Sequence, residues 1–281
     1  MWNTCDWKVQ LSLLDKALIV LKSFSEENPE WGVRKLAADL GMSPPTVQRI
    51  LKTLKKHDFL EQDEQSKRYR LGTIYFRFVE ILQSRYPLVQ VALPFMRRLC
   101  SKTGETTHLN VIDGFERLCV SSIESAQSLK AGMPIGNRSP LYAGASSKCL
   151  LAFSDAEFIS EYLDRTSLVP LTENTNTDRD KLMQEIDIIR KQGFALSHGE
   201  RTPGLGSLSV PIFGHGGSLL GALSLAIPEL RFLDDEHRRF CLSSLTKTGE
   251  AISRAMGYGG EYPPSVIRYD CGFSLNKDGE V

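Results

Sequence analysis

The sequence has no long apolar run, no close pair of cysteines and no excess of one charge. Its longest apolar stretch, residues 219–227, is much shorter than the roughly 20 residues that a membrane-spanning helix needs, so we expect no membrane partner. The first ten residues contain no basic region that leads into an apolar one, which argues against a secretory signal. We therefore expect a cytoplasmic protein.

The cysteines are too far apart in the sequence to form the close pairs of a zinc site or a redox dithiol. In a reducing compartment, separate cysteines are usually buried free thiols, so we expect no metal and no other cofactor. The six residues are Cys5, Cys100, Cys119, Cys149, Cys241 and Cys271.

The chain has 281 residues, of which 41% are hydrophobic, and this suits two ordinary domains with cores of their own. The 34 lysines and arginines balance 34 aspartates and glutamates, so the formal net charge is zero. This balance excludes a surface that is basic throughout. A nucleic-acid-binding face would have to be local.

Helical periodicity of apolar residues predicts one amphipathic helix over residues 11–24 and a second over residues 33–40. Gly41 can adopt the left-handed conformation that ends a helix. Ser43 suits the N-cap of a third helix, and Pro44 suits its first position, where the missing N–H costs nothing. The helices on either side of Gly41 therefore form a helix-turn-helix.

Two short strands are expected directly after the third helix, at residues 59–61 and 69–71, with a polar stretch between them. A hairpin in this place is the wing of a winged helix. We expect a winged helix-turn-helix DNA-binding domain over residues 11–72, with the helix-turn-helix itself at about residues 33–52.

Positive charge is concentrated in this domain, because residues 44–70 contain seven basic side chains against four acidic ones. In a helix-turn-helix the start of the second helix reads base edges, which suits Gln48 and Arg49, while other polar and basic residues contact phosphates. The alternative to DNA binding is a charged helix face that is only solvated. The candidate DNA-binding residues are Lys35, Ser43, Thr46, Gln48, Arg49, Lys52, Lys56, Lys67 and Arg68.

Residues 73–87 read as a helical linker with a broad apolar face. That face either packs against a partner chain, which predicts a homodimer or tetramer, or packs on its own domain. Both interpretations remain open at this point.

The remainder of the chain alternates predicted strands and helices. Glycines such as Gly114 and Gly214 mark hairpin turns, so residues 88–257 should form a largely antiparallel sheet with flanking helices, giving an α+β protein overall. Ser154 with Glu157, and separately Thr177, are the expected caps of two helices. Residues 258–281 should form a partly disordered tail.

Signals for catalysis are weak. Residues 146–148 lack the spacing of a Ser-x-x-Lys nucleophile, and residues 204–209 depart from a dinucleotide-binding loop. His198 beside Glu200 is the remaining acid–base candidate, and a histidine without a chemical role is the commoner case. A different feature is the run of small residues 143–147, whose backbone N–H groups at a helix start suit a small anion or simply allow close packing.

These segments resemble the IclR family of bacterial transcriptional regulators over residues 11–257. The N-terminal resemblance is carried by Leu14-Asp15-Lys16-Ala17, Leu36-Ala37-Ala38-Asp39-Leu40-Gly41, Thr46-Val47-Gln48-Arg49-Ile50-Leu51 and Tyr69-Arg70-Leu71-Gly72. The C-terminal resemblance is carried by Thr103-Gly104-Glu105-Thr106, Arg138 with Pro140-Leu141, Lys148, Pro203-Gly204-Leu205 and Val210-Pro211-Ile212.

The resemblance implies a GAF-like effector domain whose ligand lies between the sheet and the turn before the Lys148 helix. Relatives often have Arg-Cys at the Gly206-Ser207 position, and this departure concerns the ligand rather than the architecture. Neutral donors suit a carboxylate, and we expect no arginine to pair with it. The implied effector-binding residues are Ala145, Ser146, Ser197, Leu205, Ser207 and Ser224.

We thus expect a transcription factor, not an enzyme, that binds double-stranded operator DNA and responds to a small organic or aromatic acid. The alternatives are a small-molecule enzyme built on the C-terminal domain and a winged-helix adaptor for protein partners.

Overall fold

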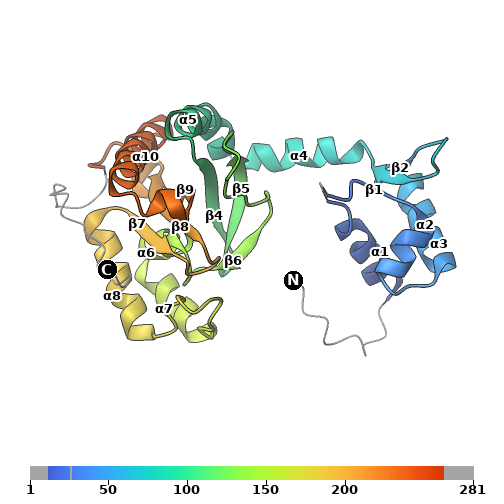
Figure 1. Cartoon of the computed structure of the whole chain (residues 1–281), viewed down its shortest axis with the longest axis horizontal. Coiled ribbons are helices and arrows are strands. Elements are labelled where there is room, and N and C mark those ends of the chain that lie inside the picture. Colours follow the sequence, from blue (N-terminus) through green and yellow to red (C-terminus); the bar gives the residue numbers. More distant parts are fainter. Residues whose placement is uncertain (1–11, 26, 86, 263–281) are drawn as a thin grey trace. The chain divides into compact units, whose positions relative to one another are not determined.

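The computed structural model describes residues 12–25, 27–85 and 87–262 (Figure 1). The chain divides into two compact units, Met1–Arg85 and Tyr86–Val281. None of the helices in the described residues is both long and apolar enough to span a membrane.

The N-terminal unit is a winged helix-turn-helix, as predicted. Its strands form a small antiparallel sheet in the order β1-β3-β2. In chain order the elements are α1 (Leu13–Lys22), β1 (Glu30–Trp31), α2 (Val33–Asp39), α3 (Pro44–Lys56), β2 (Leu60–Gln62), β3 (Tyr69–Leu71) and α4 (Ile74–Arg85).

Local signals set the helix boundaries of this unit. Ser12 and Asp15 form a capping box at the start of α1, and Gly41 has the positive φ of +60° that the turn between α2 and α3 requires. Ser43 is the N-cap of α3, but its hydroxyl pairs with Thr46 Oγ1 at 2.8 Å instead of accepting from the backbone. The core consists of Val20, Trp31, Leu36, Ala37, Val47, Ile50, Leu51, Leu60 and Tyr69.

Helix α4 leaves the wing through an aromatic cluster. The rings of Phe59, Tyr75 and Phe78 lie within 6.4 Å of one another, centre to centre. Outside this cluster, α4 carries large apolar side chains that are exposed in the single chain, among them Phe76 at 78% and Leu82 at 52%.

The C-terminal unit is a six-stranded antiparallel sheet with helices on both faces. The strand order is β6-β5-β4-β9-β8-β7. Its elements are α5 (Pro87–Thr103), β4 (Thr106–Asp113), β5 (Glu116–Ile123), β6 (Arg138–Pro140), α6 (Ala145–Ala152), α7 (Ala156–Arg165), α8 (Arg179–Gln192), β7 (Ala195–His198), β8 (Leu205–Phe213), η1 (His215–Gly217), β9 (Leu219–Pro228), α9 (Glu229–Phe232) and α10 (Asp235–Ala255).

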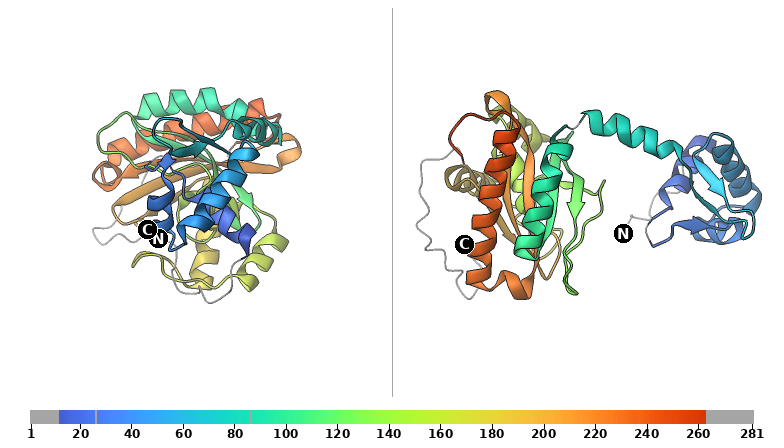
Figure 2. Two further views of the ribbon diagram at one scale, coloured as in Figure 1. Left: turned by 90° about the vertical axis from the view of Figure 1, so that its right-hand side faces the viewer. Right: turned by 90° about the horizontal axis from the view of Figure 1, so that it is seen from above.

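Helices α5 and α10 lie side by side on one face of the sheet, and α6, α7 and α8 cover the other (Figures 1 and 2). Successive side chains of a strand point to opposite faces. In β9, Leu223 and Leu225 therefore join the core under α5 and α10, while Ser224 between them faces the α6 side. The same alternation turns His108 and Asn110 of β4 toward that side, because Leu109 belongs to the α5 and α10 core.

Two expected caps are each one residue too early. Helix α7 is capped by Asp155, which accepts from Phe158 N, instead of Ser154. Helix α8 is capped by Asp178, which accepts from two amides, instead of Thr177. A carboxylate accepts amide hydrogen bonds more strongly than a hydroxyl does, so the aspartates win where both residues are available.

The first residues of the expected tail, up to Tyr262, pack against strand β8 of the C-terminal sheet. The ring of Tyr258 lies 5.2 Å from that of Phe213, and Tyr262 donates to the carbonyl of Pro211 at 2.8 Å. The rest of the expected tail, residues 263–281, lies outside the described residues.

Candidate functional site

A basic stripe runs along the solvent-facing side of α3. Gln48, Arg49, Lys52 and Lys56 are exposed, whereas Val47, Ile50 and Leu51 between them are buried. The spacing of three and four residues places the exposed group on one face of the helix. A shallow groove on this face is lined by Pro45, Gln48, Arg49, Lys52, Thr53 and Lys56.

The other predicted DNA-binding residues lie at the ends of this domain's elements. Lys67 and Arg68 are exposed at the wing turn, and Lys35 is exposed on α2 with its ammonium over the Trp31 ring. Arg70, which contributes to the local charge excess, is neutralised by Glu61 at 3.1 Å. The free positive charge therefore belongs to α3 and the wing turn.

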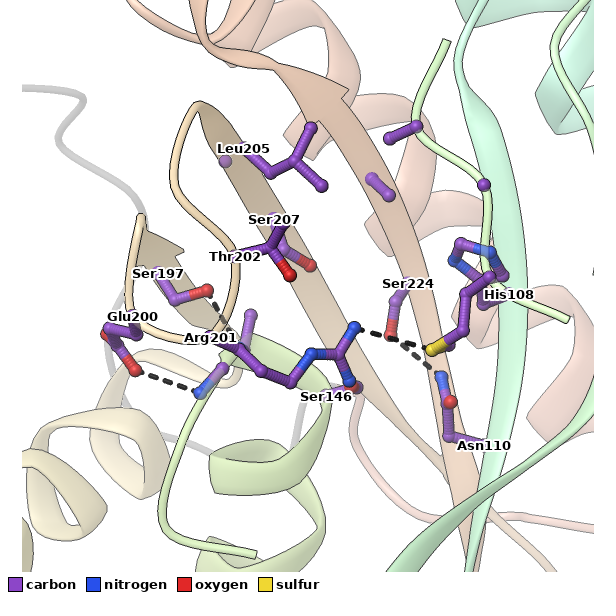
Figure 3. A pocket seen from close by; sticks show the side chains of 17 residues that line it. His108, Asn110, Ser146, Ser197, Glu200, Arg201, Thr202, Leu205, Ser207 and Ser224 are labelled. Carbon is purple, nitrogen blue, oxygen red and sulfur yellow. Dashed lines mark hydrogen bonds between the residues drawn. The ribbon is translucent and has the colours of Figure 1, made fainter. Parts of the chain in front are cut away.

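A pocket opens on the α6 side of the C-terminal sheet, with a cavity volume of about 60 Å³ (Figure 3). A cavity of this volume holds several water molecules or a small organic molecule. All six of the predicted effector-binding residues line it, together with residues that the sequence reasoning missed. The missed residues are His108, Asn110, Ala131, Gly132, Met133, Gly144, Glu200, Arg201, Thr202, Gly206 and Ala226.

The helix start at α6 differs from the expected free anion site. The Ala145 amide donates to Ser197 Oγ at 2.9 Å, and the Gly144 amide donates to Glu200 Oε2 at 2.9 Å. Two of the first amides are thus already satisfied by the protein. The predicted residues Ser146, Leu205 and Ser207 line the pocket and take no part in these two bonds. The hydroxyl of Ser224 accepts a hydrogen bond from Asn110 Nδ2 at 3.3 Å.

Arg201 corrects the expectation that no arginine is placed to pair with a carboxylate. It follows Glu200 in the segment between β7 and β8, and Figure 3 shows its guanidinium reaching across the pocket toward His108 and Asn110. Its position six residues before Ser207 was the available signal. The direction of the side chain could not be predicted from that spacing, because residues 199–204, between β7 and β8, form no regular element.

His108 is a neutral, buried group on the pocket wall. Burial, and then the charges of Arg201 and Arg117, lower its pKa to about 4. Its Nε2 atom has no hydrogen-bond partner within the described part of the chain. At neutral pH the imidazole therefore presents an uncharged polar nitrogen to the pocket.

The low pKa of His108 predicts a loss of stability in acid. The unfolded imidazole takes up its proton near pH 6.5, but the folded one does so only near pH 4, so stability falls as the pH drops through this window. Between pH 6.5 and pH 5 the loss is about 2 kcal/mol from this group alone. Urea unfolding of the full chain at both pH values should show this loss, and His108→Gln should reduce it. The same slope in His108→Gln and in the exposed control His215→Gln would contradict the prediction.

Lys148 belongs to a buried ion network behind the pocket. Its ammonium lies 2.8 Å from Glu185 and 2.6 Å from Glu200, and only 4% of the side chain is exposed. Burial lowers the pKa of Lys148, but the charges of Glu200 and Glu185 outweigh it and leave the pKa above its usual range. Lys148 stays charged and occupied, so it positions Glu200 rather than offering itself to a ligand.

The weak catalytic signal of the sequence finds a structural explanation. His198 bonds Glu229 at 2.6 Å and stacks on the Phe232 ring at 5.7 Å, while Glu200 bonds Lys148 and Gly144. The two residues that formed the candidate pair therefore serve different contacts. Within the described ranges, no group of three histidine, cysteine or acidic side chains is placed to hold a metal ion.

A winged helix-turn-helix followed by a sheet domain with an internal pocket defines the class of DNA-binding regulators with an effector domain. Comparison with known families agrees. Residues 13–64 match the IclR helix-turn-helix domain, and residues 81–254 match the bacterial transcriptional regulator IclR C-terminal domain. The chain belongs to the IclR family of bacterial transcriptional regulators, which are not enzymes.

Individual relatives match over nearly their whole length. The HTH-type transcriptional regulator KipR of Bacillus subtilis is 32% identical over 243 residues, covering 86% of this chain and 96% of that protein. The HTH-type transcriptional regulator XynR of Escherichia coli is 31% identical over 245 residues, and the match covers 87% of this chain and 97% of XynR. The crystal structure of the Thermotoga maritima IclR matches with a TM-score of 0.76 at 29% identity, and the match covers 87% of this chain and 98% of that one.

A further solved structure shares the fold at lower identity. It is an IclR homolog from Microbacterium hydrocarbonoxydans complexed with 4-hydroxybenzoate, with a TM-score of 0.72 and 22% identity. The match covers 88% of this chain and 99% of that one.

Proposed function

We propose that α3 and the wing bind double-stranded operator DNA and that a small organic or aromatic acid in the C-terminal pocket modulates this binding. Residues 11–72 then act on DNA, residues 73–87 link, and residues 88–257 sense the ligand. The observation that carries the ligand assignment is the pocket itself. It presents hydroxyls and the Arg201 guanidinium, while its one lining carboxylate, Glu200, is held by Lys148.

An acid fits this pocket better than a neutral or cationic molecule. Hydroxyl and guanidinium N–H and O–H groups donate to carboxylate oxygens, and such charge-assisted bonds are about twice as strong as neutral ones. The IclR homolog from Microbacterium hydrocarbonoxydans is complexed with an acid as well. The ligand would act by binding one of two domain arrangements better than the other.

On DNA, we propose separate roles for the exposed residues of α3 and the wing. Gln48 and Arg49 would meet base edges, with Thr46 near them, because they stand in the first turns of the recognition helix. The remaining predicted residues would meet phosphates. These are Lys35, Ser43, Lys52, Lys56, Lys67 and Arg68.

We also propose that the working form is a homodimer or tetramer. Two recognition helices per dimer would read two half-sites of an operator. The exposed apolar side chains of α4, including Phe76 and Leu82, are a suitable contact surface.

Titration of the full chain against its upstream DNA tests both halves of the proposal. Arg49→Ala should cost about 1–3 kcal/mol on the operator and little on random duplex, whereas Lys67→Ala should weaken both and flatten the salt dependence. Adding organic acids should change the operator affinity of the wild type and Lys67→Ala alike. If Arg49→Ala weakened binding to the operator and to random duplex equally, Arg49 would not contact a base edge. If no acid changed the operator affinity, the proposed ligand role would be wrong.

A further inference from the structure

Two arginines meet at the pocket wall that Met133 lines, and neither has an acidic partner. Arg201 belongs to the lining, whereas Arg117 does not and contacts it through Met133. Arg117 of β5 is fully buried, and Arg201 reaches the same place from the segment between β7 and β8. Within residues 12–25, 27–85 and 87–262, no carboxylate forms an ion pair with either guanidinium. Their hydrogen bonds go only to neutral acceptors, namely Ser139 Oγ, Asn110 Oδ1, the carbonyl and Oδ1 of Asn137, and Met133 Sδ.

This pairing is unfavourable without a counter-ion. Removing a charge from water costs several kcal/mol unless an opposite charge compensates it, and two like charges repel as well. Burial, and then the charge of Arg201, lowers the pKa of Arg117 to about 9. Burial likewise lowers the pKa of Arg201. The protein by itself therefore holds an excess of positive charge at this wall.

Met133 stands where a stronger acceptor would be expected. Its thioether sulfur accepts from Arg117 Nη1 at 2.9 Å and from Arg201 Nη2 at 3.3 Å. A thioether is a weak acceptor, so two guanidiniums gain little from sharing one. Met133 also lines the pocket, as Arg201 does.

His108 is an independent sign that a polar ligand belongs here. The side chain is 3% exposed, lines the same wall and leaves Nε2 without a partner among the described residues. A buried polar atom without a partner costs about 1–3 kcal/mol, and a ligand oxygen or hydroxyl would relieve that cost.

We propose that the effector is a small aliphatic dicarboxylate. One carboxylate would replace Met133 Sδ as the shared acceptor of Arg201 and Arg117, and the other would accept from Ser146 and Ser207. Two carboxylates balance two guanidiniums, whereas a monocarboxylate leaves one positive charge buried. The cavity volume of about 60 Å³ has room for only a few non-hydrogen atoms besides the space that Met133 Sδ would vacate, so the chain between the two carboxylates must be short. This inference rests on the proposed acid-sensing function and specifies its ligand class.

Calorimetry on the full chain tests the inference with acids of matched length. Succinate and glutarate should bind at least about tenfold more tightly than butyrate and valerate, since charge-assisted bonds to the second carboxylate are lost in the monoacids. Arg201→Gln should remove most of this difference between diacids and monoacids. The control Arg179→Gln removes an exposed arginine of α8 that pairs with Asp164 of α7 and does not line the pocket, and it should leave the difference intact.

A second readout separates ligand recognition from a structural role. Without ligand, Arg201→Gln should unfold at the same or a higher temperature than the wild type, because it removes an uncompensated charge. A lower unfolding temperature with an unchanged preference for diacids would overturn the inference. Equal binding of mono- and dicarboxylates would overturn the dicarboxylate assignment and leave the acid-sensing function standing. Absence of binding by any of these acids, with no response to other acids in the DNA assay, would overturn both.

Discussion

Replacing Lys148 with methionine should destabilise the C-terminal domain by about 3–5 kcal/mol, which is the usual cost of removing one partner from a buried ion network. Methionine keeps most of the volume of the lysine side chain but leaves Glu185 and Glu200 facing each other without the ammonium. Glu200 also accepts from the Gly144 amide, so the start of α6 and the pocket wall should loosen together.

Urea unfolding followed by circular dichroism measures this loss. Lys130→Met is the matched control, because Lys130 pairs with Glu124 at a surface where both side chains are about half exposed. Such pairs contribute about 0–1 kcal/mol, so the control should unfold nearly as the wild type does. Adding Glu200→Gln to Lys148→Met should recover part of the stability. A loss for Lys148→Met no larger than that of Lys130→Met would show that the network is not needed.

Replacing Gly206 with alanine should disrupt the contact between β8 and α9 and cost about 3 kcal/mol. A Cβ atom at Gly206 would lie 2.0 Å from the ring of Phe232, which is fully buried. The ring is fully buried and stacks on His198, so moving away from the new methyl group would disturb its other packing contacts. The space that a side chain at position 206 would need is thus filled by Phe232.

A double-mutant cycle identifies the cause of that loss. Phe232→Ala should be destabilising by about 3–5 kcal/mol because it opens a cavity. In Gly206→Ala with Phe232→Ala the methyl group no longer meets the ring, so the combined loss should be well below the sum of the two single losses. Additive losses would place the strain of Gly206→Ala somewhere other than the Phe232 ring.

Much of the N-terminal unit could be predicted from the sequence because its signals are local. Gly41, Ser43 and Pro44 act on their own turn of the chain, and the helices begin and end close to the predicted positions. Strand β1 was missed. Glu30–Trp31 is too short to show any alternation and becomes a strand only by pairing with β3.

In the C-terminal unit, the six predicted effector-binding residues do line one pocket, and strand alternation explains why. Their hydrogen bonds could not be predicted. The Ala145 amide and the Ser197 hydroxyl lie 52 residues apart in the chain and satisfy each other in space. Such a bond depends on the packing of α6 against β7, which no local pattern describes.

The sequence by itself determined most of the order of the helices and strands and the basic stripe of α3, because periodicity and capping act between near neighbours in the chain. Only the tertiary structure decided which charges are compensated. Lys148 meets two carboxylates from distant segments, whereas Arg117 and Arg201 meet each other and a thioether. The physical reason is that compensation of a buried charge depends on distance in space and on exclusion of water, and both are properties of the packed chain.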